Sequence, residues 1–170
     1  MKKITIVCLF GFSVAIATSC TSKNIKNESA LKKVNTVWLD SIVKNSDSTF
    51  SKKYRTADFA TAEYYLFKKD SSVCQVMKDT AKTIRQILVS KKNIRTYFAQ
   101  YYANGQLIAD VKLDNYGQPD GSATYYYETG KIMRAGKYRH GLAVEQWEEF
   151  DEKTSTRFIA VYDSNGVRKD

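Results

Sequence analysis

The sequence predicts a mainly β protein: a single-layer antiparallel β-meander of hairpin repeats, with an N-terminal signal peptide and one short amphipathic helix. Three observations lead to this prediction. The stretch YYANGQL, residues 101–107, returns as YYETGKI, residues 126–132, and a fixed period of this length is typical of a repeat architecture. Tyr, Phe, Val, Ile and Thr come in short runs between turn formers, which is strand composition. Leu107, Ala109 and Val111 alternate with a mixed set of residues, as in a half-buried strand.

The first twenty residues predict a secretory signal. A basic end, Lys2 and Lys3, precedes an apolar run from Ile4 to Ala17, and small residues follow before Cys20. This run is shorter than the roughly 20 residues that a spanning helix needs. We therefore expect the segment to be cleaved and not kept as a membrane span.

The end of this segment resembles the lipobox of bacterial lipoproteins, with Ala17, Thr18 and Ser19 ahead of Cys20, although many lipoboxes carry Leu in place of Ala17. The resemblance implies diacylglycerol on the Cys20 sulfur, cleavage before Cys20 and acylation of the new amino terminus. Several acyl chains on one residue make a stable anchor. The alternatives are an ordinary secreted protein in which Cys20 is accidental, or a retained anchor. Thr21 in place of Asp resembles the sorting pattern of outer-membrane lipoproteins, so we expect a lipid-anchored protein in the cell envelope, at the outer membrane and facing the periplasm.

The chain divides into four expected segments: signal peptide (1–19), flexible tether (20–30), helix and linker (31–53), and β-meander with repeats (54–170), clearest at 101–151. Apolar residues at helical spacing predict the helix from Ala30 to Asn45, with Trp38 as its packing anchor. The first strands are expected at 59–67, 73–77, 83–89 and 94–102, although residues 73–88 also fit a helix.

Glycines mark the expected turns of the repeats. Asn104-Gly105 predicts a type I′ turn, in which both central residues take positive φ. Gly130 and Gly141 occupy similar places, and Pro119 lies in a further turn.

The repeated stretches resemble the bacterial variant of the MORN repeat, found in the YwqK-type antitoxin family and in many small lipoproteins. Thr129 in place of Asn, Ala123 in place of Trp and a degenerate third copy at 145–166 depart from the pattern. The resemblance implies a single-layer meander used as a binding or spacing module, with no shared catalytic residue. It rests on Tyr101, Tyr102, Asn104, Gly105 and Leu107, on Tyr126, Tyr127, Glu128, Gly130, Lys131 and Ile132, and on Asp120-Gly121.

Charge and cysteine usage add two expectations. Residues 20–100 hold 16 basic and 7 acidic residues, whereas residues 101–170 hold 9 and 11. A basic face in the first half could meet anionic lipid head groups or an acidic partner. With Cys8 in the signal and Cys20 carrying lipid, only Cys74 is left. Its apolar neighbours favour a buried inert thiol over a reactive one.

The sequence gives little indication of catalysis. His140 lies in a turn, and the carboxylates of EQWEEFDE, residues 145–152, lack apolar neighbours that would raise a pKa. We expect no catalytic residue, no metal site and no cofactor beyond the covalent lipid on Cys20.

The predicted function is a non-catalytic protein-interaction module, such as an accessory component of an envelope or secretion assembly. Its partners would be membrane lipid, through Cys20, and an unidentified protein, with no nucleic acid and no small-molecule cofactor. One alternative is an immunity or antitoxin protein that neutralises a toxin by direct binding. A weaker one is a glycan or peptidoglycan binder. Tyr102, Tyr126 and Trp147 are the candidate partner-binding aromatics.

Overall fold

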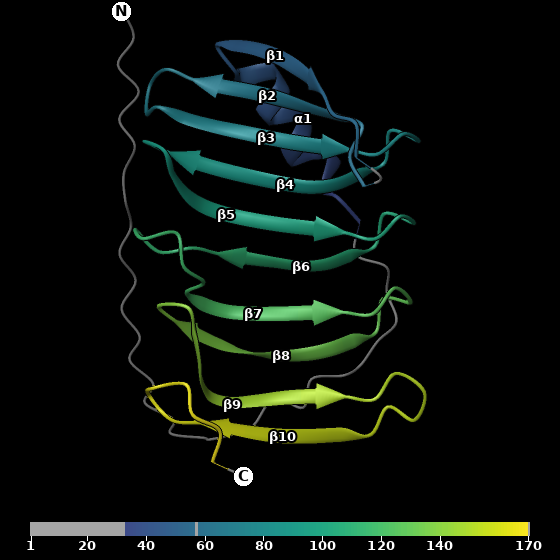
Figure 1. Cartoon of the computed structure of the whole chain (residues 1–170), viewed down its shortest axis with the longest axis vertical. Coiled ribbons are helices and arrows are strands. Elements are labelled where there is room, and N and C mark those ends of the chain that lie inside the picture. Colours follow the sequence, from purple (N-terminus) through teal and green to yellow (C-terminus); the bar gives the residue numbers. More distant parts are fainter. Residues whose placement is uncertain (1–32, 57, 170) are drawn as a thin grey trace, which may run out of the picture.

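The fold is an open antiparallel sheet whose ten strands follow one another in chain order, with one short helix (Figure 1). The computed structural model describes residues 33–56 and 58–169. The predicted β-meander is confirmed within them. The expected signal peptide, lipobox and tether lie outside the described residues. The elements are α1 (Thr36–Asn45), β1 (Ser48–Lys53), β2 (Thr61–Phe67), β3 (Ser72–Lys78), β4 (Ile84–Lys91), β5 (Ile94–Tyr101), β6 (Leu107–Lys112), β7 (Gly121–Tyr126), β8 (Ile132–Arg139), β9 (Leu142–Phe150) and β10 (Arg157–Tyr162).

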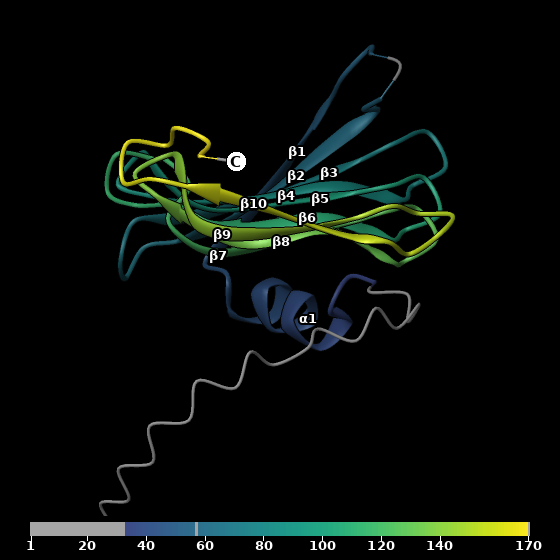
Figure 2. The same cartoon turned by 90° about the horizontal axis from the view of Figure 1, so that it is seen from below.

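The two faces of the sheet differ in what covers them. Helix α1 lies against one face, and the β1–β2 hairpin rises above the opposite face (Figure 2). We call the face away from α1 the open face. Strand alternation and cross-strand register place on it, among others, Phe50, Leu88, Phe98, Val111 and Tyr125.

Helix α1 starts at Thr36, later than the expected start at Ala30. Asn35 precedes the helix in an extended conformation and is its N-cap. Its side chain accepts a hydrogen bond of 3.0 Å from the Trp38 backbone N–H. Trp38 is confirmed as the packing anchor: it packs against a core that includes Cys74 and lies 6.4 Å from the ring of Tyr97.

One expectation about the first half is corrected, and the strands expected at 73–77 and 83–89 are confirmed. Residues 48–53, expected as linker, form strand β1, which pairs with β2 at the edge of the sheet. All six of its residues are exposed, so it carries no apolar alternation that sequence could reveal. Residues 73–88 form strands β3 and β4 and not a helix, because Val76 and Ile87 meet as cross-strand partners in the core.

A ladder of side-chain hydrogen bonds between successive turns explains the repeat. These turns lie along one side of the sheet, at the ends of β5, β7 and β9 (Figure 1). The Tyr102 hydroxyl donates to the Tyr126 carbonyl at 3.1 Å, and 25 residues later the Tyr127 hydroxyl donates to the Phe150 carbonyl at 2.8 Å. The first tyrosine of each pair, Tyr101 or Tyr126, is buried instead in the core on the α1 face. Each aromatic pair thus supplies one core residue and one link between hairpins.

The expected type I′ turn at Asn104-Gly105 is wrong. Only Gly105 has positive φ, at 82°, and its N–H donates to the Tyr102 carbonyl at 3.0 Å, so four residues close the turn and the glycine forms a bulge. Gly130, at 86°, closes its turn in the same way. At His140-Gly141 both residues have positive φ, 48° and 82°, as a type I′ turn requires.

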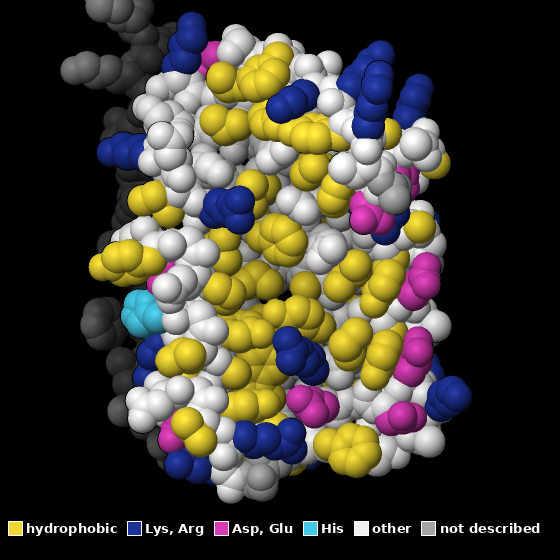
Figure 3. All heavy atoms as spheres, in the orientation of Figure 1, with side chains coloured by type: hydrophobic (Ala, Val, Ile, Leu, Met, Phe, Trp, Pro, Cys, Tyr) yellow, Lys and Arg dark blue, Asp and Glu magenta, His cyan; other side chains and the backbone are white. Residues whose placement is uncertain are grey.

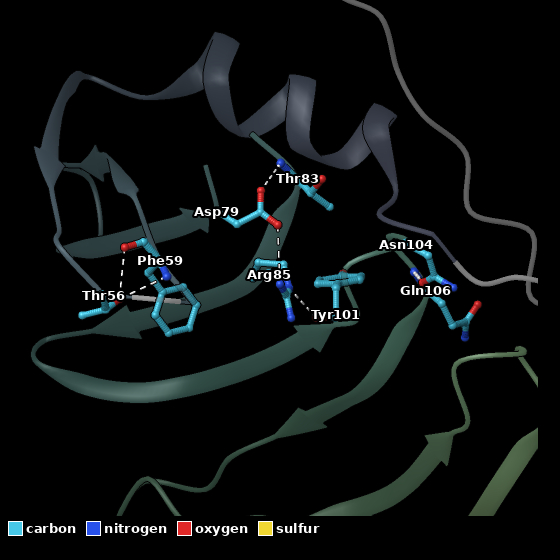
Figure 4. Close-up of polar contacts among 8 residues, drawn as sticks. All are labelled: Thr56, Phe59, Asp79, Thr83, Arg85, Tyr101, Asn104 and Gln106. Carbon is cyan, nitrogen blue, oxygen red and sulfur yellow. Dashed lines mark hydrogen bonds and ion pairs between the residues drawn. The ribbon is translucent and has the colours of Figure 1, made fainter. Parts of the chain in front are cut away.

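A polar cluster holds the end of β5 where the ladder begins (Figure 4). Arg85 of β4 donates from Nε to the Tyr101 carbonyl at 3.1 Å, next to the register shift between Gln100 and Tyr101. The Arg85 guanidinium also pairs with Asp79 at 3.4 Å. The Arg85 side chain thereby joins β4 to the last residue of β5.

Candidate functional site: the open face of the sheet

The open face carries a nearly continuous apolar band that crosses the strands (Figure 3). One row of cross-strand partners crosses six strands, and among its members only Gln75 is not apolar or aromatic. The row runs Phe50, Tyr64, Gln75, Leu88, Phe98 and Val111. Patches of this kind on a protein surface commonly mark contacts with another molecule.

A hollow of about 360 Å³ lies in the middle of this band. Strands β4 to β7 and the turn after β6 line it, and its floor includes the buried residues Ala109 and Val111. Most lining side chains are apolar: Leu88, Phe98, Ile108, Leu113 and Pro119, with Tyr125 at the β7 side. Burial of a ligand's apolar surface here would be favourable by about 25 cal/mol per Å².

Polar groups at the hollow are few. Arg95 is the one charged residue that lines it, and no carboxylate does. Gln100 also lines it and faces Gln86 as its cross-strand partner. Gln75, farther along the apolar row, is already used, since its amide donates to the Tyr64 hydroxyl at 3.0 Å.

An aromatic cluster forms the next part of the open face. Trp147 lies flat on Gly136, where a Cβ atom would come 2.1 Å from the indole ring. Tyr138 meets the indole edge to face at 4.9 Å. The Arg134 guanidinium lies 4.3 Å from the centre of the Tyr125 ring and 5.1 Å from that of Trp147.

The three aromatics that the sequence singled out are not free surface. Trp147 is 2% exposed and Tyr126 is 5% exposed. Tyr102 is half-buried, and its hydroxyl links two turns. The expectation that these rings are exposed for a partner is therefore corrected: they pack the sheet. Sequence alone could not reveal the residues that do form the open face, because cross-strand register brings them together.

Cys74 is a buried free thiol, 1% exposed, as expected. Burial raises its pKa to about 11, so the reactive thiolate is scarce at neutral pH.

Four carboxylates of residues 145–152 are used in structural contacts, those of Glu145, Glu148, Asp151 and Glu152. Glu145 pairs with Lys137 at 3.0 Å, and Glu148 pairs with Arg157 at 3.4 Å. Asp151 lies beyond the end of β9. Its carboxylate accepts hydrogen bonds from the next turn, chiefly from Thr154, which lower its pKa.

His140, in its turn, contacts Asp114 of the turn before β7. Their side chains approach to 2.8 Å, between His140 Nδ1 and Asp114 Oδ2, and this hydrogen bond lowers the pKa of Asp114. The histidine is largely exposed. Across residues 33–56 and 58–169, no cluster of His, Cys, Asp and Glu has the makings of a metal site. In the same part of the chain, no helix has the length and apolar character to cross a membrane.

No family model and no curated protein matches the chain. Among solved structures, the crystal structure of TarM is similar with a TM-score of 0.39 and 11% identity, over 75% of this chain and 24% of that one. The crystal structure of an S. aureus TarM mutant in complex with fondaparinux, alpha-GlcNAc-glycerol and UDP has a TM-score of 0.24 and 9% identity. This chain thus spans about a quarter of the length of those proteins. Likeness at this level carries no argument about function.

Proposed function

We propose that this chain is a lipid-anchored protein of the cell envelope that binds another protein through the open face of its sheet. The observation that carries the proposal is the apolar band with its central hollow, which no described helix covers. An apolar surface of this kind in water gains free energy when a partner covers it. The anchoring half of the proposal is supported by the signal layout that ends at Cys20.

The binding proposal is tested by cross-linking in intact cells. A photo-reactive amino acid at Gln100, on the open face, should form a covalent complex with one discrete partner. The matched control carries the same group at Val37, which is 78% exposed on α1, on the other side of the sheet. Adducts from both positions, or from neither, would contradict the proposal.

The anchoring proposal has a separate test. Radiolabelled palmitate should enter the protein in cells, and Cys20→Ala should abolish the label. Equal labelling of that variant would reject the anchor without touching the binding proposal.

A further inference from the structure

We infer that the hollow of the open face binds an extended peptide segment of the partner, with apolar side chains at alternate positions and a carboxylate that pairs with Arg95. This deepens the proposed function and rests on it.

The shape of the hollow fits alternate side chains of an extended chain. Its volume of about 360 Å³ falls in the range of about 300–1,000 Å³ typical of binding pockets. Every second side chain of an extended peptide points to the same side. Two such apolar side chains can therefore contact Leu88, Phe98 and Leu113 while the intervening ones stay in solvent.

The positive charge at the hollow favours a partner segment that carries an anionic group. Arg95 is exposed at its rim, and none of the ion pairs found among the described residues involves its guanidinium. Arg134 lies outside the hollow, beside Tyr125, where ring contacts and the Tyr138 hydroxyl hold it and Glu149 is its cross-strand partner. Arg95 therefore carries the positive charge of the hollow. Arginine binds a carboxylate through two parallel hydrogen bonds, which sets the position of the carboxylate as well as its affinity.

The amides favour a peptide over a fatty acid. Gln86 and Gln100 face each other across β4 and β5, and each side chain can donate and accept a hydrogen bond. A peptide backbone offers both kinds of group along its length, whereas an acyl chain has polar atoms only at its carboxylate. A second copy of this chain is also disfavoured, because a two-fold contact through the open face would bring its arginines toward those of the partner copy.

The probe is a library of random heptapeptides displayed on phage, selected against the full-length chain purified from cells in detergent. Selected peptides should alternate apolar and polar residues and carry Asp or Glu at one fixed position. Selection against Arg95→Glu should replace that acid with Lys or Arg. Selection against Arg55→Glu, a change of the same charge outside the hollow, should match wild type.

A selected peptide then gives the affinity by fluorescence anisotropy. Arg95→Glu should weaken its binding by about fivefold or more. Exchanging the acid for Lys in the peptide should restore binding to that variant, and Arg55→Glu should leave Kd unchanged. Circular dichroism and thermal melts confirm that both variants are folded.

Several outcomes overturn the inference. These are no enriched motif, a motif that Arg95→Glu leaves unaltered, displacement of every selected peptide by palmitate, or a dimer in sedimentation velocity that Arg95→Glu dissociates. If no peptide binds while the group at Gln100 still cross-links a partner in cells, the inference fails and the proposed function stands. If cross-linking also fails, the proposed function fails with it.

Discussion

Strands β2 to β5 and strands β7 to β10 bury their apolar side chains in different ways. The first set lies under α1, whose residues Trp38 and Ile42 pack against a core cluster that includes Cys74 and Val76. The second set has no described helix over it, and its largest buried side chain, Trp147, is covered by neighbours on the same sheet. An open sheet can thus form a core either with a helix or by laying a large ring over a glycine.

The comparison also explains where the molecule stays open. Hollows of about 490 and 590 Å³ flank α1, so the helix covers its face of the sheet incompletely. On the opposite face the aromatic cluster around Trp147 ends at Tyr125, and the hollow begins there. The hollow of the open face is therefore the region that neither form of packing fills.

The largest loss of stability is expected from disrupting the packing of Trp147 on Gly136. Gly136→Ala should lower the free energy of unfolding by about 3 kcal/mol, because the added Cβ overlaps the Trp147 ring. Chemical denaturation measures the change. In a Trp147→Ala background the same substitution should cost far less. Equal costs in both backgrounds would show that Gly136 does not serve to seat the indole.

A smaller loss of stability is expected from truncating the side chain that packs α1 against the sheet. Trp38→Ala should cost about 2 kcal/mol, since the ring is only partly buried against the core. Hydrogen exchange should rise in α1 and in β3 to β5 and stay unchanged in β8 to β10. The exposed neighbour gives the control: Val37→Ala should change stability by less than about 0.5 kcal/mol. Increased exchange throughout the sheet would contradict two separately packed regions.

Substitutions in the turns of the repeats should cost less stability than substitutions in either core. Gly105→Ala should cost about 1 kcal/mol, because φ of 82° strains a residue with a Cβ while no atom lies within 4 Å of it. Gly105→Asn should cost less, since Asn reaches positive φ more easily. Thermal unfolding of both variants checks the order, and a larger loss with Asn would refute the strain argument.

The smallest effect on stability is expected at the contact between Asp114 and His140, two residues in turns, and it depends on pH. The hydrogen bond with His140 lowers the folded-state pKa of Asp114, so its contribution is present above the unfolded pKa and is lost as pH falls through the folded one. The Tm of wild type should therefore fall more than that of Asp114→Asn between about pH 6 and about pH 2. Asp58→Asn serves as the control and should follow wild type. Parallel curves for wild type and Asp114→Asn would exclude this linkage.

Much of the fold can be predicted from sequence, because the same hairpin pattern occurs twice in the chain. The pairs Tyr101-Tyr102 and Tyr126-Tyr127, each followed by a turn glycine, indicate consecutive hairpins. Strand β1 could not be predicted, since an exposed edge strand needs no apolar residue at alternate positions. Apolar spacing alone puts the helix start too early, because it does not identify Asn35 as the cap.

The candidate site could be predicted much less well. The sequence around Trp147 does not distinguish a buried ring from an exposed one, and only the tertiary contact with Gly136 shows why it is buried. The hollow depends on register: Leu88, Phe98 and Val111 come from three strands and meet only after the bulges of β5 and its neighbours are placed. A single sequence does not specify those shifts.

The most direct test of the central claim measures whether the open face is covered in the cell. Gln100→Cys should react readily with a hydrophilic maleimide in the purified protein and be protected in intact cells. Val37→Cys should react equally in both settings, and the buried Cys74 should stay unreactive in the folded protein. Equal labelling of Gln100→Cys in purified protein and in cells would contradict the claim that a partner occupies the open face.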